Sequence, residues 1–129
     1  MAEEQRKILI IDDEPDALDM ITEFLSKRNF EIVTALDGEE GLKKFNDESP
    51  SVVVCDIRMP KKDGFQFLGD LRNGKEWVPV IILSALTDPS AAFQSYRLEA
   101  DYYLTKPVNL PDLLKAIEIM FSLIPLRKK

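Results

Sequence analysis

The stretch "ILIIDDEPD", residues 8–16, places two adjacent acids directly after four aliphatic residues. A continuous aliphatic run of this kind is typical of a strand covered on both faces, as in a parallel sheet. Two like charges at the end of such a strand lie close to the core, so they need a neutralising partner or a binding role. Asp12 and Asp13 are therefore the first candidate site residues.

Four further short apolar runs follow the first, and segments long enough for helices separate them. The five runs lie at 7–12, 31–35, 51–56, 78–84 and 101–106. The first, third and fourth runs are almost wholly aliphatic, which predicts central strands, whereas the mixed second and fifth runs predict edge strands.

Apolar residues between these runs recur at helical spacing, as Leu18, Ile21 and Leu25 do in the first segment. The other segments show the same pattern at Leu42 and Phe45, at Phe67, Leu68 and Leu71, at Ala92 and Tyr96, and at Leu113, Leu114, Ile117 and Phe121. The chain therefore alternates five strands with five helices, which predicts right-handed crossovers and a doubly wound α/β fold.

Helix boundary residues support these five segments. Asp37 with Glu40 three residues later resembles a capping box, and Asp88 before Pro89 is typical of an N-cap followed by a first-turn proline. Asn109 before the last helix and Gly74 at the end of the third are further boundary residues. We interpret residues 1–129 as one domain, folded from about residue 7 to 123, with a short polar N-terminus and a basic "PLRKK" tail.

The composition excludes several kinds of chemistry. The chain has no histidine, so it contains no imidazole nucleophile, general base or metal ligand. Cys55 is the only cysteine, which excludes an internal disulfide and a cysteine zinc site, and its apolar neighbours predict a small buried side chain. Any chemistry must come from carboxylates, hydroxyls and lysine.

Charge and hydropathy indicate which kinds of partner and which cellular location to expect. Against 17 basic residues stand 23 acidic ones, so no direct contact with nucleic acid is expected. No apolar run approaches the roughly 18 residues of a membrane span, and the polar, acidic N-terminus does not resemble a signal peptide. We expect a soluble cytoplasmic protein without membrane contact.

Polar residues end four of the predicted strands. Asp12 and Asp13 end the first, Asp56 the third, Ser84 the fourth and Lys106 the fifth. Ligands of doubly wound sheets bind outside the carboxyl ends of the strands, so these side chains are expected at one edge. Three carboxylates in one cleft need a cation, and an all-oxygen set with room for water suits Mg²⁺.

A magnesium ion and a lysine ammonium beside one carboxylate could hold a phosphoryl group. The carboxylate could then act as the nucleophile and form an acyl phosphate, with Asp56 as the candidate acceptor. A plainer interpretation stays open: Asp13 only caps the first helix, Asp12 is solvated in a loop, and Ser84 and Lys106 are an ordinary strand-end hydroxyl and surface lysine.

The motifs "IDDEPD", "CDIRMPKKDGF", "ILSA" and "DYYLTKPV", in this order and spacing, resemble the receiver domain of two-component response regulators. The resemblance spans essentially the whole chain. Within this family, the chain is similar to the single-domain chemotaxis response regulators. It implies a flavodoxin-like fold with a five-stranded parallel sheet of order 2-1-3-4-5 and helices on both faces.

The resemblance implies that Asp56 accepts a phosphoryl group from a histidine kinase or a histidine phosphotransfer protein. Mg²⁺ would be held by Asp13, Asp56 and the backbone carbonyl of Arg58, with Asp12 acting mainly through water. The phosphate would be held by Lys106, Ser84 and the N–H of Ala85. The domain would help to catalyse its own phosphorylation and dephosphorylation.

The resemblance implies that Tyr103 matches the aromatic residue that swings inward on activation, and phosphorylation is expected to pull Ser84 toward the phosphate. The affected face consists of helix four, strand five and helix five, and it would bind a downstream partner or form a homodimer. The Lys106–Pro107 peptide bond is expected to be cis. The sequence identifies neither the kinase nor the output.

Some positions depart from the family pattern or vary within it. Glu99 stands where the family often has glycine, so the exit of helix four is expected to differ. Arg58 and Leu86 each lie two residues past a site residue, and we hypothesise that Arg58 tunes loss of the phosphoryl group. Gly64 is expected to supply a permissive backbone near the third helix.

Two other functions remain open. In a haloacid dehalogenase-type phosphatase, Asp12 would be the nucleophile and Glu14 the second acid, although the chain lacks a cap insertion. A scaffold that works without phosphorylation is also compatible with the fold, but such scaffolds commonly lose an acid or the lysine, and none is missing here.

Overall fold

The computed structural model describes residues 6–57, 63–74, 77–85 and 101–127. Its strands are β1 (Arg6–Ile11), β2 (Phe30–Ala35), β3 (Val52–Asp56), β4 (Val80–Ala85) and β5 (Tyr102–Lys106), and its helices are α1 (Pro15–Ser26), α2 (Gly38–Glu48), α3 (Gly64–Arg72) and α5 (Leu110–Arg127). The strands form one parallel sheet of order β2-β1-β3-β4-β5. The predicted doubly wound, flavodoxin-like fold is confirmed, while the predicted helix at Ala92 and Tyr96, with its Asp88–Pro89 start, lies outside the described residues.

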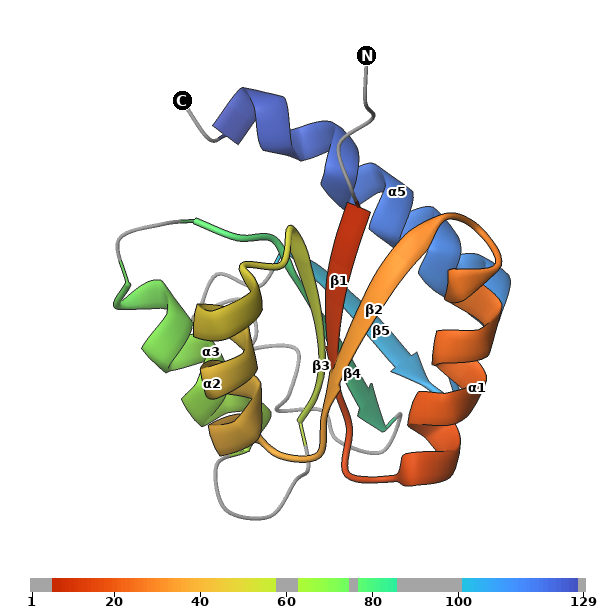
Figure 1. Cartoon of the computed structure of the whole chain (residues 1–129), viewed down its shortest axis with the longest axis horizontal. Coiled ribbons are helices and arrows are strands. Elements are labelled where there is room, and N and C mark those ends of the chain that lie inside the picture. Colours follow the sequence, from red (N-terminus) through yellow and green to blue (C-terminus); the bar gives the residue numbers. More distant parts are fainter. Residues whose placement is uncertain (1–5, 58–62, 75–76, 86–100, 128–129) are drawn as a thin grey trace.

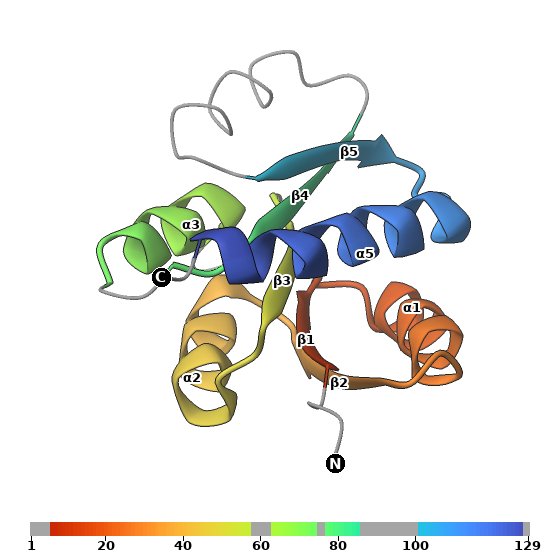
Figure 2. The ribbon, with the colours of Figure 1, turned by 90° about the horizontal axis from the view of Figure 1, so that it is seen from above.

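Helices cover both faces of the sheet (Figures 1 and 2). On one face, α1 and α5 pack over a core that includes Ile8, Ile10 and Leu113. On the other, α2 and α3 pack over a core that includes Leu9 and Phe67. Alternate residues of β1 therefore belong to the two cores, as the period of a strand requires.

The pattern of burial explains which strands lie in the centre. Residues 8–11 of β1 and 52–55 of β3 are completely buried, Cys55 among them, because each strand has neighbours on both sides and helices above and below. The mixed strands β2 and β5 are at the two edges of the sheet and are only partly buried. The prediction of central and edge strands is confirmed.

The helix boundaries agree with the predictions in part. Asp37 accepts a hydrogen bond from the Glu40 N–H at 2.8 Å, but Glu40 binds the N–H of Leu36 instead of completing a capping box. A complete capping box, which we did not predict, joins Asp63 and Gln66 at the start of α3.

Two further boundary residues lie close to their predicted roles. Asn109 caps α5 by accepting the N–H of Asp112 at 3.0 Å. At the other end of α3, the N–H of Gly74 donates to Leu71, two residues after the helix ends at Arg72.

A buried ion pair ties the end of α3 to the start of two strands. Arg72 Nη2 lies 2.9 Å from Asp101 Oδ2, and the same oxygen accepts the Val80 N–H. Arg72 Nη1 also donates to the carbonyl of Val78. One guanidinium and one carboxylate thereby fix the amino-terminal ends of β4 and β5 against α3.

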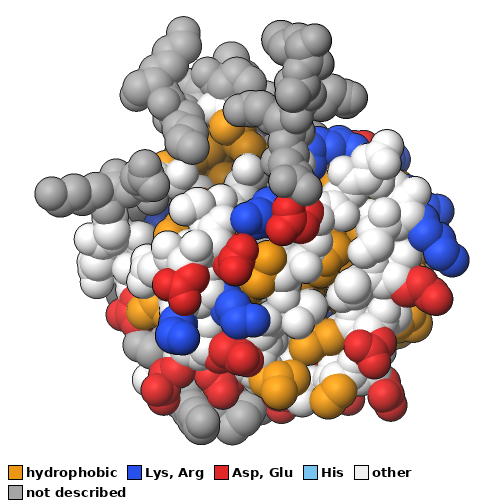
Figure 3. Space-filling model, in the orientation of Figure 1, with side chains coloured by type: hydrophobic (Ala, Val, Ile, Leu, Met, Phe, Trp, Pro, Cys, Tyr) orange, Lys and Arg blue, Asp and Glu red, His pale blue; other side chains and the backbone are white. Residues whose placement is uncertain are grey.

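The surface shows mixed charge. On the face drawn in Figure 3, acidic side chains are spread with Lys and Arg between them, and the described part shows no continuous basic area. Among the described residues, no helix is long and apolar enough to cross a membrane.

Candidate functional site

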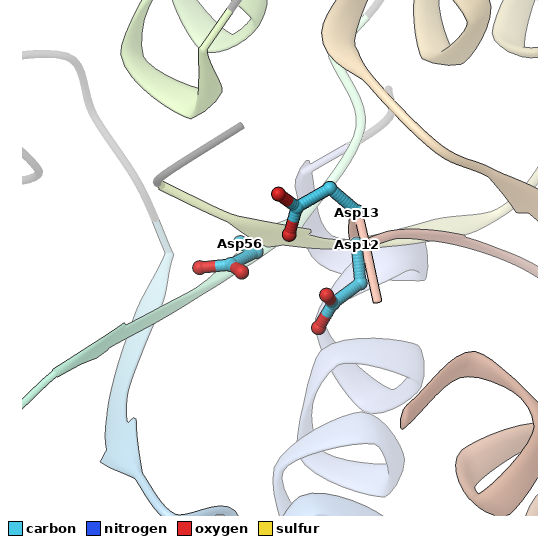
Figure 4. A group of neighbouring side chains, drawn as sticks. All are labelled: Asp12, Asp13 and Asp56. Carbon is cyan, nitrogen blue, oxygen red and sulfur yellow. The ribbon is translucent and has the colours of Figure 1, made fainter. Parts of the chain in front are cut away.

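The three predicted acids meet at the carboxyl edge of the sheet. Asp12 and Asp13 directly follow β1, and Asp56 is the last residue of β3. The two strands are neighbours, with Ile11 paired to Cys55, so their ends lie side by side. One carboxylate oxygen from each acid lies within 4.8 Å of the others, and Figure 4 shows the three side chains around one space.

The acids differ in exposure. Asp12 and Asp56 are buried, with 1% and 5% of their surface exposed, whereas Asp13 is exposed. Asp12 Oδ1 accepts the N–H of Glu14 at 2.9 Å, and Glu14, not Asp13, is the N-cap residue of α1. The plainer interpretation, in which Asp13 caps the helix and Asp12 is solvated, is therefore wrong.

Lys106 extends from the end of β5 into the same space. Its Nζ lies 2.8 Å from Asp56 Oδ2 and 3.6 Å from Asp12 Oδ2. Burial alone would lower the pKa of Lys106, but the hydrogen bond to Asp56 and the charges of Asp56, Asp12 and Glu14 outweigh it, so the pKa is raised. The lysine is held as an ammonium ion, and its peptide bond to Pro107 is cis, as expected.

The end of β4 completes the edge. Ser84 is buried and pairs with Thr105, and the backbone of Ala85 pairs with Lys106, so both lie on the strand between Asp56 and the lysine. Tyr103 is half-buried and packs against the core under α2 and α3. The predicted contributors Arg58, Leu86 and Glu99 lie outside the described residues.

Gly64 has a different role from the one predicted. None of the described glycines has a positive φ, so a permissive backbone is not the reason for this residue. A β carbon at position 64 would lie 2.5 Å from the carbonyl oxygen of Asp56 and 2.8 Å from the Cα of Ile57. Glycine is required because α3 starts against the backbone of the central acid. The "DGF" motif indicates a glycine near the site, but it does not predict that α3 lies against the Asp56 backbone.

An apolar hollow of about 470 Å³ adjoins the acids. It is lined by Asp12, Glu14, Ala17, Met20, Ile21, Leu83, Lys106, Pro107 and Val108. Met20 is 53% exposed, which is high for a large apolar side chain. The hollow therefore lies between α1 and the residues that follow β5, and it reaches two of the polar site residues.

The balance of charge in the site suits a divalent cation. Three carboxylates share the space with one described ammonium, that of Lys106. Ionised carboxylates this close repel each other, and burial strengthens the repulsion for Asp12 and Asp56. An all-oxygen set of ligands is what Mg²⁺ and similar hard cations prefer.

Comparison with known proteins identifies the family. Residues 8–118 match the family model of the response regulator receiver domain. This match covers most of β1, the other four strands and the acidic site, so the chain belongs to the receiver domain family of two-component systems. A dehalogenase-type phosphatase built on Asp12 and Glu14 is thus not supported.

Curated relatives share the domain but are longer. The chain is 40% identical over 113 residues to response regulator RR06 of Streptococcus pneumoniae, covering 88% of this chain and 52% of the relative. It is 36% identical over 104 residues to the alkaline phosphatase synthesis transcriptional regulatory protein PhoP of Bacillus subtilis, covering 81% and 43%. The chain thus spans about half the length of these relatives.

Solved structures share the fold over nearly their whole length. A response regulator receiver domain protein from Clostridium thermocellum is 35% identical, with a TM-score of 0.87 and coverage of 93% of this chain and 97% of that one. The chemotaxis protein CheY4 of Vibrio cholerae is 28% identical, with a TM-score of 0.83 and coverage of 91% and 99%. The structural neighbours therefore include single-domain regulators.

Proposed function

We propose that Asp56 is the phosphoacceptor of a signalling switch. The observation that carries this proposal is the position of Asp56, which ends a central strand between Asp13 and Lys106 and receives the lysine ammonium at 2.8 Å. A carboxylate so placed has a cation ready to neutralise an incoming phosphoryl group. The proposal rests on this geometry and on membership of the receiver family.

The metal in this proposal is Mg²⁺. Asp13 and Asp56 would bind it together with the carbonyl of Arg58, and Asp12 would act mainly through water. When bound, the ion supplies positive charge that offsets the carboxylates and the phosphoryl oxygens.

The chain's own residues would orient the phosphoryl group. Lys106 holds one Asp56 oxygen and would pair with a phosphate oxygen after transfer, while Ser84 and the N–H of Ala85 would donate further hydrogen bonds. In the transfer, an Asp56 oxygen forms a bond to phosphorus as the bond from phosphorus to the donor imidazole nitrogen breaks. The electron pair of that bond leaves with the imidazole, and Asp56 becomes an acyl phosphate.

The donor would be a phosphohistidine outside these 129 residues, which contain no histidine. A histidine kinase is the general partner of the receiver family. A histidine phosphotransfer protein would serve equally well, and the domain would help to catalyse both the arrival and the loss of the phosphoryl group.

The output would pass through the face of helix four, β5 and α5. Ser84 would move toward the phosphate and Tyr103 would move inward, which shifts an equilibrium between two forms of this face. A downstream protein, an attached domain or a second copy would read the change. Several relatives are named as transcriptional regulators, which is an output compatible with this face.

Intact mass spectrometry tests the proposal. The protein is incubated with acetyl phosphate and Mg²⁺, with EDTA and with Asp56→Asn as the two controls. We expect one added phosphoryl group that is absent from both controls. A label that survives in Asp56→Asn would contradict the assignment of the acceptor, and the absence of label with protein and small donors alike would favour a scaffold.

A further inference from the structure

Glu14 is fixed at the edge of the acidic site by its backbone. Its N–H donates to Asp12 Oδ1 at 2.9 Å, and it is the N-cap residue of α1. Its side chain makes no capping hydrogen bond to α1, and the residue is exposed. Glu14 instead lines the hollow that also reaches Asp12 and Lys106.

The charge of Glu14 acts on the position where a phosphoryl group would bind. Glu14 and Lys106 line the same hollow, and the Lys106 ammonium lies 2.8 Å from Asp56 Oδ2. Since the negative charge of Glu14 attracts the Lys106 ammonium, it must also repel an anion that approaches this ammonium. The repulsion grows with the charge of the approaching donor.

We infer that Glu14 selects among phosphodonors by charge, which rests on the proposed function of Asp56. It disfavours acyl phosphates, which are dianions, relative to donors with a protonated nitrogen on phosphorus. Acetyl phosphate and phosphoramidate are small examples of the two classes. In both reactions an Asp56 oxygen bonds to phosphorus, and the electron pair of the broken bond leaves with acetate or with ammonia.

The rate of labelling of Asp56 by these two donors tests the inference. Intact mass gives the rates for the wild type and Glu14→Gln at saturating Mg²⁺ and neutral pH. For two unit charges about 6–10 Å apart in water, removing one of them changes a rate roughly two- to threefold for each unit of charge on the donor. We expect Glu14→Gln to raise the rate of labelling by acetyl phosphate about four- to tenfold and the rate of labelling by phosphoramidate about two- to threefold. The ratio of the two rates should move further in Glu14→Lys and return toward that of the wild type in about 1 M salt.

Glu23→Gln is the matched control. It removes the same charge from an exposed position of α1, but Glu23 does not line the hollow and lies nine residues further along the chain. At a rise of about 1.5 Å per residue, the two positions are roughly 13 Å apart along the helix, beyond the screening length at ordinary salt. The ratio of the two rates should equal that of the wild type.

The outcomes are distinguishable. If the ratio is the same in wild type and Glu14→Gln, the inference is overturned. An unchanged ratio in which both rates shift equally, with an altered Mg²⁺ affinity in calorimetry, would show that Glu14 acts through the metal. If neither small donor labels the wild type, donor selection fails, and if a phosphohistidine protein does not label it either, the proposed function fails as well.

Discussion

Lys106 Nζ lies 2.8 Å from Asp56 Oδ2 and 3.6 Å from Asp12 Oδ2, so one ammonium pairs with two carboxylates. Asp13 adds a third carboxylate within 4.8 Å of these two. In the described site, negative charge therefore exceeds positive charge, and folding must bring these groups together against their repulsion. The stability of the protein should depend on what neutralises the excess.

Removal of one acid tests this dependence. In EDTA, we expect Asp13→Asn to be more stable than the wild type by about 0.5–1 kcal/mol, since the repulsion at about 5 Å in water is of this size. Mg²⁺ should raise the melting temperature of the wild type and raise that of the variant much less. Thermal unfolding with and without Mg²⁺ measures both effects. An equal Mg²⁺ shift in the two proteins would show that Asp13 does not bind the metal.

Gly64 and Gly69 offer a matched pair of substitutions in α3. A β carbon at Gly64 would lie 2.5 Å from the Asp56 carbonyl oxygen, while one at Gly69 has no neighbour within 4 Å. We expect Gly64→Ala to lose about 1–3 kcal/mol in urea unfolding, as overpacked sites do, and to label slowly at Asp56 because the backbone there must shift. Gly69→Ala should gain about 0.5–1 kcal/mol and label normally. A Gly64→Ala protein with normal stability and labelling would refute the close approach.

The sequence predicted what depends on local pattern. Aliphatic runs identified the central strands, and the rule that ligands bind at the carboxyl edge correctly placed Asp12, Asp56 and Lys106 together. Both predictions work because a parallel sheet places every carboxyl end at one edge. The contact between α3 and the Asp56 backbone was missed, because a glycine at the start of a helix is equally compatible with a turn.

Contacts between residues far apart in the sequence could not be predicted either. Arg72 and Asp101 are 29 positions apart, and neither belongs to a motif that would pair them. Likewise, the hollow beside Asp12 forms only when α1 packs near the residues that follow β5. Such features depend on packing geometry, which composition and periodicity do not encode.

The Arg72–Asp101 pair should contribute strongly to stability. Only 14% and 7% of the two side chains are exposed, so removing one charge leaves the other buried. We expect Asp101→Asn to lose about 2–4 kcal/mol in urea unfolding, near the range for broken buried pairs. Asp47→Asn is the control, because Asp47 pairs with Lys43 on the exposed face of α2, where such a pair contributes about 0–0.5 kcal/mol. Similar losses in the two variants would contradict a special role for the buried pair.

Cys55 should report unfolding through its ionisation. Burial, followed by the charges of Asp56, Asp63 and Asp12, raises the pKa of its thiol well above 9.0. In the folded protein the thiol stays neutral as the pH passes 9.0, whereas in the unfolded chain it ionises. Ionisation therefore favours the unfolded state, and stability should fall as the pH rises from about 8 to about 10.

A comparison of the wild type with Cys55→Ala isolates this effect. Between pH 8 and pH 10, the free energy of unfolding should fall by about 1.4 kcal/mol more in the wild type than in the variant. Each pH unit above the pKa of the unfolded thiol contributes about this amount. Urea unfolding at the two pH values measures the difference. The thiol should also react with a disulfide reagent only in urea, because Cys55 is completely buried beside Asp56. Rapid reaction of the folded protein, or parallel pH profiles for the two proteins, would show that the thiol is accessible to water.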